Sequence, residues 1–311
     1  MALLEVKNLH TYFKTKKGTV KAVNDVSYSL EPGRTIGIVG ESGSGKSVSA
    51  MSILRLLDDN GYIASGSIRF DGKELTTLPL SDMYHIRGNA ISVIFQEPMT
   101  SLNPVFSVER QLCEPFMIHQ GMRKKEARRS ALKMLYDVQI PNPETVMRQY
   151  PHQLSGGMRQ RVMIAMALCC NPKLIIADEP TTALDVTIQA QILDLLRDVK
   201  NKISGSIMLI THDLGVVANV ADRVAVLYAG QIVEVGTTEE VFYDPRHPYT
   251  WALLSSLPQL AQRDTELFSI TGTPPSLYNK IAGDPFAPRN PYCLKIDVVK
   301  APPMFKITET H

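Results

Sequence analysis

Residues 36–47 read IGIVGESGSGKS, a short apolar segment followed by a glycine-rich loop that ends in lysine and serine. The apolar segment predicts a buried strand, and the apolar residues that recur after the loop predict a helix over residues 46–57. A loop of the form GxxxxGK, then serine or threonine, between a strand and a helix is typical of sites that bind nucleotide phosphates. Its glycines let backbone N–H groups converge on phosphate oxygens, and the helix N-terminus adds a favourable dipole. The residues of this predicted phosphate site are Gly40, Ser42, Gly43, Gly45, Lys46 and Ser47.

Two side chains of the loop carry distinct chemistry. Lys46 is expected to reach the β- and γ-phosphates, and the Ser47 hydroxyl is expected to ligate Mg²⁺. A glycine-rich turn that binds nothing is the alternative, and motifs found further along the chain count against it. By itself the loop indicates nucleotide binding and no particular reaction.

A second apolar segment, residues 174–179, reads LIIADE and ends in two carboxylates. We expect Asp178 to hold Mg²⁺, directly or through water, and Glu179 to act on the attacking water as general base. On its own such a pair is more often a solvated turn, here before Pro180. The phosphate loop upstream reverses that preference.

The remaining pattern indicates an α/β protein. Strands alternate with helices, which predicts a mainly parallel sheet. Residues 98–160 have a helical texture broken by prolines, with a helix start at Asn142 and Pro143. After Pro245 the chain is rich in proline, so we expect an extension with little regular structure. The expected strands are residues 3–6, 23–30, 36–39, 90–95, 174–177 and 207–210, and an amphipathic helix is expected over residues 188–203.

The bulk properties exclude few classes of protein. The 311 residues carry a formal net charge of +2, which gives no strong attraction to nucleic acid or acidic lipid. The four cysteines form no CxxC pair, which indicates reduced thiols in a cytosolic protein. The first residues do not read as a signal peptide, and no run reaches the roughly 18 apolar residues of a membrane span. We therefore expect any membrane role to depend on a partner.

Between the two motifs, residues 154–161 read LSGGMRQR, which resembles the LSGGQ signature of ABC ATPases. Met158 stands where that family usually has glutamine, and the Ser-Gly-Gly core is intact. Ser155, Gly156 and Gly157 open a predicted helix over residues 158–170, where exposed N–H groups and a hydroxyl can bind an anion. An ordinary helix cap is the alternative for this motif taken alone.

Further motifs resemble those of the same family and follow in its order. Gln96 resembles the Q-loop glutamine, which ligates Mg²⁺ and senses the γ-phosphate. Asp185, at the end of residues 183–185, resembles the D-loop aspartate, and His212 resembles the switch histidine that contacts the γ-phosphate. Phe13 resembles the aromatic residue that stacks on adenine, with Tyr12 as the second choice. The resemblance covers roughly residues 1–245.

The resemblance implies a fold and a mechanism. The fold is a P-loop NTPase (RecA-like) core with an antiparallel β subdomain and a helical subdomain at about residues 98–160. Residues 1–245 would form the nucleotide-binding domain, and residues 246–311 the proline-rich extension. ATP would be held between two subunits and its hydrolysis would release them. One subunit would supply Lys46, Ser47, Gln96, Asp178, Glu179 and His212, and the other Ser155, Gly156 and Gly157.

The extension narrows the substrate class. Residues 246–250, 271–275 and 285–289 resemble the C-terminal extension of oligopeptide and dipeptide importer ATPases, and residues 148–152 fit the same subfamily. Related importers of nickel or of some sugars share this extension, so an importer of nickel or another small solute is the alternative.

The extension departs from many relatives at the positions of their cysteines. Asp284, Asn290 and Asp297 stand there, and Cys293 falls out of register. An iron–sulfur cluster needs about four cysteines, so we predict none. Asp284 and Asp297 could together hold a hard cation, but solvated loop carboxylates are the favoured interpretation.

The resemblance also implies partners and a location. The expected partners are a second ABC ATPase, two integral-membrane permeases and, indirectly, an extracytoplasmic peptide-binding protein. A heterodimer with a homologous ATPase is favoured over two copies of this chain. No nucleic-acid partner is expected. The chain would lie peripherally on the cytoplasmic face of the membrane and receive the permease near residues 106–116. A soluble ABC ATPase of DNA repair or translation is disfavoured by the single phosphate loop, and a scaffold without turnover by the presence of Glu179 and His212.

Overall fold

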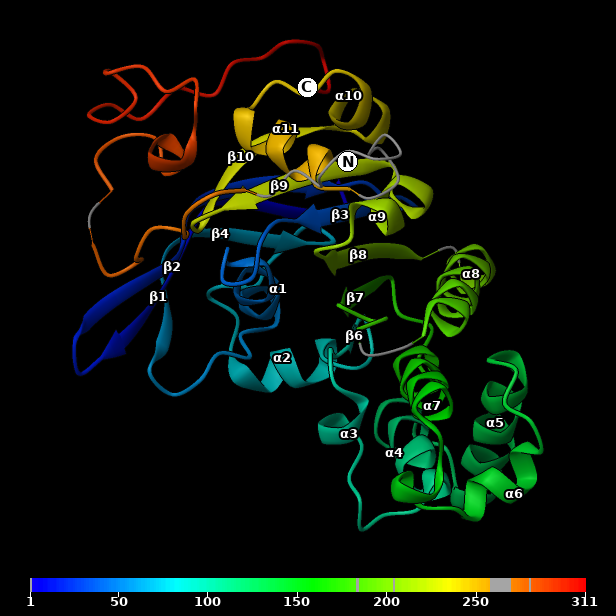
Figure 1. Cartoon of the computed structure of the whole chain (residues 1–311). Coiled ribbons are helices and arrows are strands. Elements are labelled where there is room, and N and C mark those ends of the chain that lie inside the picture. Colours follow the sequence, from blue (N-terminus) through cyan, green and yellow to red (C-terminus); the bar gives the residue numbers. More distant parts are fainter. Residues whose placement is uncertain (1, 183–184, 204, 258–269, 280) are drawn as a thin grey trace. The chain divides into compact units, whose positions relative to one another are not determined.

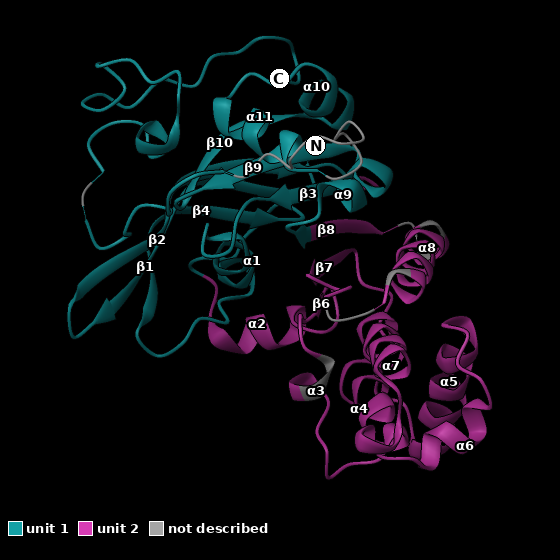
Figure 2. Ribbon diagram, in the orientation of Figure 1, with its two compact units in different colours: residues 1–31, 35–77, 210–311 teal, residues 32–34, 78–209 magenta. Residues whose placement is uncertain are grey.

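The computed structural model describes residues 2–182, 185–203, 205–257, 270–279 and 281–311. Figure 1 labels the helices and strands along the chain. They belong to two units, coloured separately in Figure 2. Unit 1 contains residues 1–31, 35–77 and 210–311, and unit 2 contains residues 32–34 and 78–209. Unit 1 is therefore assembled from both ends of the sequence.

Unit 1 contains a four-stranded antiparallel sheet in the order β2-β1-β4-β5. Strands β1 and β2 are much longer than the predicted strands at residues 3–6 and 23–30. Register shifts between residues 6 and 12 interrupt the alternating pattern, which hides the strand in the sequence. The antiparallel β part of the predicted fold is confirmed. The strands are β1 (Leu4–Thr15), β2 (Gly18–Leu30), β4 (Gly61–Phe70) and β5 (Lys73–Glu74).

A second group of strands in unit 1 supports the phosphate loop. Strand β3 (Thr35–Val39) is buried along its whole length and pairs in parallel with β9 (Arg223–Tyr228). Strand β9 pairs in turn with β10 (Gln231–Thr237) in antiparallel fashion. Helix α1 (Lys46–Leu54) follows the loop and ends before the predicted residue 57, because Arg55 adopts a left-handed conformation with φ 53°. The strand, loop and helix predicted from residues 36–47 are confirmed.

The C-terminal region belongs to unit 1 and is packed against it. It contains α11 (Pro248–Ser255) and a short 3₁₀ turn, η3 (Ala287–Arg289), while the other described residues beyond 270 form turns and irregular segments. Tyr249, Phe286 and Arg289 are buried here. The expectation of little regular structure is confirmed. The irregular segments are nevertheless held by buried side chains. Helices α9 (Leu214–Val220) and α10 (Thr238–Tyr243) precede this region.

Unit 2 combines three strands with a group of helices. Strands β6 (Ile91–Ile94), β7 (Leu174–Asp178) and β8 (Ser206–Thr211) are neighbours in the order β8-β7-β6, and β6 and β7 run in parallel. Strand β8 ends in unit 1, because the units divide after residue 209. Asn142 precedes α6 with Pro143 in its first turn, as predicted. The helices are α2 (Leu80–Ile86), α3 (Pro98–Ser101), α4 (Val108–Gln120), α5 (Lys124–Asp137), α6 (Pro143–Arg148), α7 (Gly156–Leu168) and α8 (Val186–Ile203), with a 3₁₀ turn η1 (Pro151–Gln153) before α7.

Within the described ranges, no helix combines the length and the apolar character needed to cross a bilayer.

Candidate nucleotide-binding site

The loop after β3 has a backbone shape that only glycine allows at two positions. Gly40 has φ 149° and Gly45 has φ 100°. A Cβ atom on Gly40 would lie 2.1 Å from the carbonyl oxygen of Leu227, and one on Gly45 would lie 2.4 Å from that of Ala22. Both contacts are with backbone atoms, which cannot move aside as a side chain can. The sequence therefore fixes the tight path of the loop through these two glycines.

Lys46 lies in the loop rather than in solvent. Its side chain is buried, and its Nζ donates hydrogen bonds to the carbonyl oxygens of Gly40 at 2.7 Å and Glu41 at 2.9 Å. The Ser44 hydroxyl is also buried and has no hydrogen-bond partner among the described residues. An ammonium group poised over a loop whose hydroxyl lacks a partner fits the oxygens of a nucleotide phosphate.

The aromatic residues proposed to receive adenine lie on β1 in the same unit. Phe13 is partly exposed, and its ring lies against the backbone of Gly61, where an added Cβ would come within 2.7 Å of it. Tyr12 is engaged by its neighbours, because its ring packs edge-on to Tyr62 and its hydroxyl donates to Asn24 at 3.3 Å. Stacking of Phe13 on adenine stays a prediction.

His212 also lies in unit 1, exposed and directly after β8. The following residue, Asp213, caps α9 by accepting hydrogen bonds from the N–H groups of Gly215 and Val216. The cap fixes the start of α9, and with it the point at which the chain changes direction after His212. Its contact with a γ-phosphate stays a prediction.

In unit 2, the structure brings two of the predicted residues into direct contact. Asp178 ends β7 and is buried, and Glu179 follows it with φ 46°. The Gln96 side chain donates its Nε2–H to Glu179 Oε2 at 3.0 Å, and the Thr182 hydroxyl donates to the same oxygen at 2.9 Å. A left-handed conformation costs a residue with a Cβ about 1–2 kcal/mol. Such strain is common where a side chain must be aimed for function.

The Ser-Gly-Gly segment forms the exposed start of α7. Ser155 is the N-cap residue, and its hydroxyl accepts a hydrogen bond from the N–H of Met158 at 3.3 Å. Ser155 and Gly156 are exposed, whereas Gly157 packs closely on Ile188, 3.1 Å from an added Cβ. The predicted helix start is confirmed. The N-terminus of α7 is therefore accessible to a ligand from outside unit 2. Anion binding there stays a prediction.

Of the predicted D-loop, residues 183–184 lie outside the described residues. Asp185 is exposed and caps α8, since its Oδ1 accepts a hydrogen bond from the N–H of Ile188 at 2.9 Å. This capping role explains the aspartate without a nucleotide, and a role in ATP binding stays a prediction.

Ser47, Gln96 and Asp178 were predicted to hold Mg²⁺, and they belong to two different units. In the described part of the chain, no group of three or more histidine, cysteine, aspartate or glutamate side chains could hold a metal ion. A hydroxyl, an amide and one carboxylate are oxygen ligands of the kind Mg²⁺ takes together with nucleotide phosphates and water. The residue types therefore fit the ion only in company with a nucleotide.

Asp284 and Asp297 each accept a hydrogen bond from a nearby backbone N–H group. Asp284 Oδ1 accepts a hydrogen bond from the N–H of Phe286 at 2.9 Å, and Asp297 Oδ2 accepts one from that of Leu294 at 2.8 Å. The favoured interpretation as solvated loop carboxylates was wrong for Asp284, which is buried. Its position is fixed because its own N–H donates to the Asp297 carbonyl at 2.7 Å.

Sequence reasoning missed three residues that meet at the phosphate loop. Glu41 lies in the loop, and Tyr249 and Arg289 come from the C-terminal region. Sequence spacing could not pair them, because more than 200 residues separate Glu41 from either partner.

Two family models match the chain. The first, described as ABC transporter, matches residues 23–182, and the second, described as oligopeptide/dipeptide transporter, C-terminal region, matches residues 233–296.

Curated relatives and solved structures agree with these models. The oligopeptide transport ATP-binding protein OppD of Bacillus subtilis is 57% identical over 99% of this chain and 87% of its own length. The dipeptide transport ATP-binding protein DppD of Lactococcus lactis is 52% identical over 99% of this chain and 89% of its own length. A dimeric structure of the ATP-binding cassette MJ0796, in a post-hydrolysis state with ADP and Pi, matches with TM-score 0.68 and 28% identity over 76% of this chain and 98% of the other.

Proposed function

The chain belongs to the ABC transporter family, and from that premise we propose that it hydrolyses ATP to power the import of oligopeptides or dipeptides. The main support for ATP hydrolysis is the loop around Lys46. Its path requires glycine at two positions, and its lysine ammonium points into the loop, which suits a nucleotide phosphate. The proposed cargo is supported by the family model that matches the C-terminal region and by relatives whose names specify oligopeptide or dipeptide transport. No relative quoted above is named for nickel, so that alternative is not favoured.

We propose the following roles for the side chains of unit 1. Lys46 binds the β- and γ-phosphates, and the Ser47 hydroxyl ligates Mg²⁺, whose charge helps to neutralise the phosphates. Phe13 stacks on adenine, and His212 contacts the γ-phosphate. The loop glycines Gly40, Gly43 and Gly45 allow backbone N–H groups to approach the phosphate oxygens, with Ser42 among them.

In unit 2, we propose Glu179 as the general base and Asp178 and Gln96 as Mg²⁺ ligands, partly through water. The contact of Gln96 with Glu179 supports this, because a residue that senses the metal then also orients the base. Phosphoryl transfer depends mainly on such positioning and on charge stabilisation.

We propose that Ser155, Gly156 and Gly157 act on ATP bound by a second ABC ATPase, most simply a homologous chain. Their exposure supports this, and the MJ0796 cassette is described as dimeric. Asp185 would lie at the same interface.

The assembly would include two permeases at the cytoplasmic face of the membrane and, indirectly, an extracytoplasmic peptide-binding protein. The permease would meet the exposed residues around α4, such as Val105 and Ile118, because Leu112 and Phe116 within the predicted stretch 106–116 are buried. The domain limits 1–245 and 246–311 remain part of the proposal.

The cargo is tested in a strain that lacks this chain and requires an amino acid supplied only within a peptide. We expect no growth on tri- to pentapeptides, full growth with the free amino acid, and rescue by the intact chain but not by Glu179→Gln. Nickel uptake measured in the same strain should stay normal. Normal growth on peptides with lost nickel uptake would instead support the small-solute alternative.

A further inference from the structure

Glu41 connects the phosphate loop to the C-terminal region through its backbone N–H and its carboxylate. Its backbone N–H donates to the Tyr249 hydroxyl at 2.8 Å. Its carboxylate accepts two hydrogen bonds from the Arg289 guanidinium, at 2.6 and 3.0 Å. Its carbonyl oxygen accepts from Lys46 Nζ at 2.9 Å and from the Ser44 N–H at 3.2 Å. One residue thus joins the C-terminal contacts to those that shape the loop.

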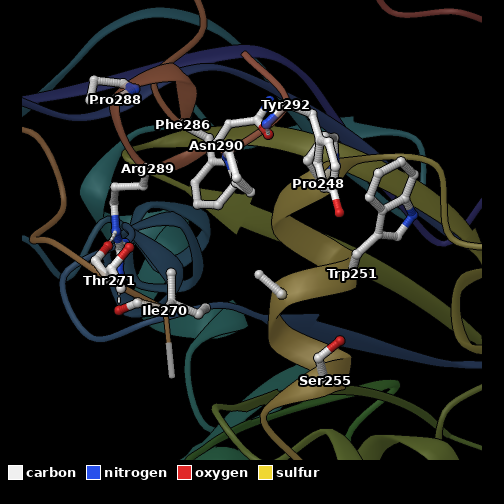
Figure 3. Close-up of a pocket in the computed structure, with 12 residues that line it drawn as sticks. Pro248, Trp251, Ser255, Ile270, Thr271, Phe286, Pro288, Arg289, Asn290 and Tyr292 are labelled. Atoms are coloured by element: carbon white, nitrogen blue, oxygen red, sulfur yellow. Dashed lines mark hydrogen bonds between the residues drawn. The ribbon is translucent and has the colours of Figure 1, made fainter. Parts of the chain in front are cut away.

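The guanidinium of Arg289 is fully used in this arrangement. It has five N–H donors, and the structure gives an acceptor to each. Nε donates to the Thr271 carbonyl at 2.9 Å, and the two terminal nitrogens donate to Glu41, to the Tyr228 hydroxyl at 3.2 Å and to the Ile270 carbonyl at 3.4 Å. Figure 3 shows Arg289 beside Thr271 and Ile270. The side chain is only 4% exposed, against 26% for Glu41.

An aromatic cluster holds this arginine in place. Tyr228, Tyr249 and Phe286 are buried, with ring centroids 4.5 to 5.4 Å apart. The guanidinium carbon lies 5.8 Å from the Tyr228 centroid and 6.0 Å from that of Phe286. The hydrogen bond to Glu41 raises the pKa of Arg289, and burial raises the pKa of Tyr249. The Arg289 guanidinium and the Tyr249 phenol therefore stay protonated across the physiological range.

A neighbouring pocket does not compete for Arg289. It has a volume of about 460 Å³ and is lined by α11 and by the segment around η3 (Figure 3). Trp251, Phe286 and Tyr292 give it an apolar wall. Arg289 also borders it, but all of its donors already have acceptors. The charge of Arg289 is therefore directed to Glu41 and not to a ligand in the pocket.

We propose that Arg289 and Tyr249 are positioning residues for nucleotide binding, which hold Glu41 so that the phosphate loop is already shaped before ATP arrives. This inference rests on the proposed function. A glycine-rich loop has many accessible conformations, and a ligand that must order it loses affinity. Fixing Glu41 fixes a carbonyl group that Lys46 contacts and the turn from Glu41 to Ser44. The C-terminal region then contributes to ATP affinity without touching ATP.

Two conservative variants test this in the purified full-length chain. Arg289→Lys keeps the positive charge but loses the two-pronged contact. Tyr249→Phe keeps the ring but removes the acceptor for the Glu41 N–H. We expect each to weaken binding of N-methylanthraniloyl-ATP with Mg²⁺ by about tenfold, the loss that follows from one or two charge-assisted or buried hydrogen bonds. In the assembled complex, KM for ATP should rise while kcat stays near that of the wild type.

A matched control separates positioning from general destabilisation. Thr250 is buried on the same helix α11, and its hydroxyl donates to Glu234 Oε2 at 2.5 Å, without a contact to Glu41. Thr250→Val should lower Tm and leave ATP affinity unchanged. Combining Glu41→Gln with Arg289→Lys should weaken binding no more than the stronger single change, because both remove the same contact. Affinity that falls in step with Tm in all variants, including Thr250→Val, would overturn the inference.

Lys46→Ala distinguishes this inference from the proposed function. If the wild type and Lys46→Ala bind the analogue equally, or neither binds it, the proposed nucleotide site is wrong. If only Lys46→Ala loses binding, while Arg289→Lys and Tyr249→Phe bind as the wild type does, the site stands and the positioning role is wrong.

Discussion

The Gln96 side-chain amide donates a hydrogen bond to Glu179 Oε2 at 3.0 Å, although 83 residues separate the two in sequence. Each was singled out by a different motif, and the structure of unit 2 joins them. Thr182 donates to the same oxygen at 2.9 Å. Two donors on one carboxylate oxygen fix the orientation of the group that we propose as general base. A base works only when its lone pair points at the proton that it removes.

Glu179→Gln should therefore abolish turnover without loss of ATP binding. The amide keeps the size of the side chain and cannot accept the proton of the attacking water. We expect ATP hydrolysis by the assembled complex to fall by about 10²–10⁴-fold, the usual contribution of a general base. Thr182→Val, which removes only an orienting bond, should cause a smaller loss. Undiminished hydrolysis with Glu179→Gln would assign the base elsewhere.

Gly45→Ala should remove nucleotide binding, because the new Cβ would lie 2.4 Å from the Ala22 carbonyl oxygen at φ 100°. The matched control is Gly33→Ala, where φ is 73° and nothing lies within 4 Å of the Cβ position. The control pays only the left-handed backbone penalty of about 1–2 kcal/mol. Binding of fluorescent ATP and urea unfolding of both variants measure the difference. Equal effects of the two substitutions would show that the steric contact does not shape the loop.

Ser155→Asp should separate the capping role of this residue from its proposed role in a partner's ATP site. Aspartate caps helices as well as serine does, so stability should remain within about 0.5 kcal/mol of the wild type. A carboxylate beside a γ-phosphate repels it, so hydrolysis should fall. Ser155→Ala should lower both quantities, because it removes the helix cap, at a cost of about 1 kcal/mol of stability, and also removes the hydroxyl that we propose contacts the γ-phosphate.

The Ser155→Asp effect should be confined to one of the two sites. In a complex whose partner carries the inactive phosphate loop, the substitution should leave the hydrolysis at this chain's own loop unchanged. Where this chain's loop is inactivated instead, it should reduce hydrolysis. Loss in the first complex would place Ser155 at its own subunit's nucleotide.

The sequence predicted the parts of the candidate site that lie in one continuous segment. The loop around Lys46, the carboxylates ending β7 and the helix cap at Ser155 each combine a motif with a strand or helix that periodicity reveals. The length of β1 was not predictable, because its register shifts disrupt the period of two.

Contacts made by tertiary packing left no such signal. Glu41 and Arg289 are 248 residues apart, and an ion pair has no periodicity by which to recognise it. The proline-rich stretch that contains Asp284 and Arg289 has the composition of a solvated segment. Both residues are nevertheless buried, because Phe286 of this stretch packs against Tyr228 and Tyr249. The sequence thus predicted an irregular, proline-rich extension. It did not predict the contacts of Tyr249 and Arg289 with the phosphate loop.

We expect His247 to make the stability of the folded protein depend on pH. It caps α11, since its Nδ1 accepts a hydrogen bond from the N–H of Tyr249 at 3.1 Å. Burial lowers the pKa of His247, against an opposite and smaller effect of the Asp284 and Glu234 carboxylates. A protonated Nδ1 could not accept the Tyr249 bond. The folded protein therefore holds this histidine neutral.

The sign of the effect follows from proton binding. The unfolded histidine titrates near its ordinary pKa of about 6.5. Below that pH the unfolded chain binds a proton that the folded chain does not, so the free energy of unfolding falls as the pH drops. His247→Asn keeps a good capping acceptor and removes the titration. Urea unfolding at about pH 7.5 and about pH 5.5 should show a smaller loss of stability for the variant than for the wild type, because all other groups titrate alike in both. An equal or larger loss in the variant would mean that His247 is not held neutral in the folded state.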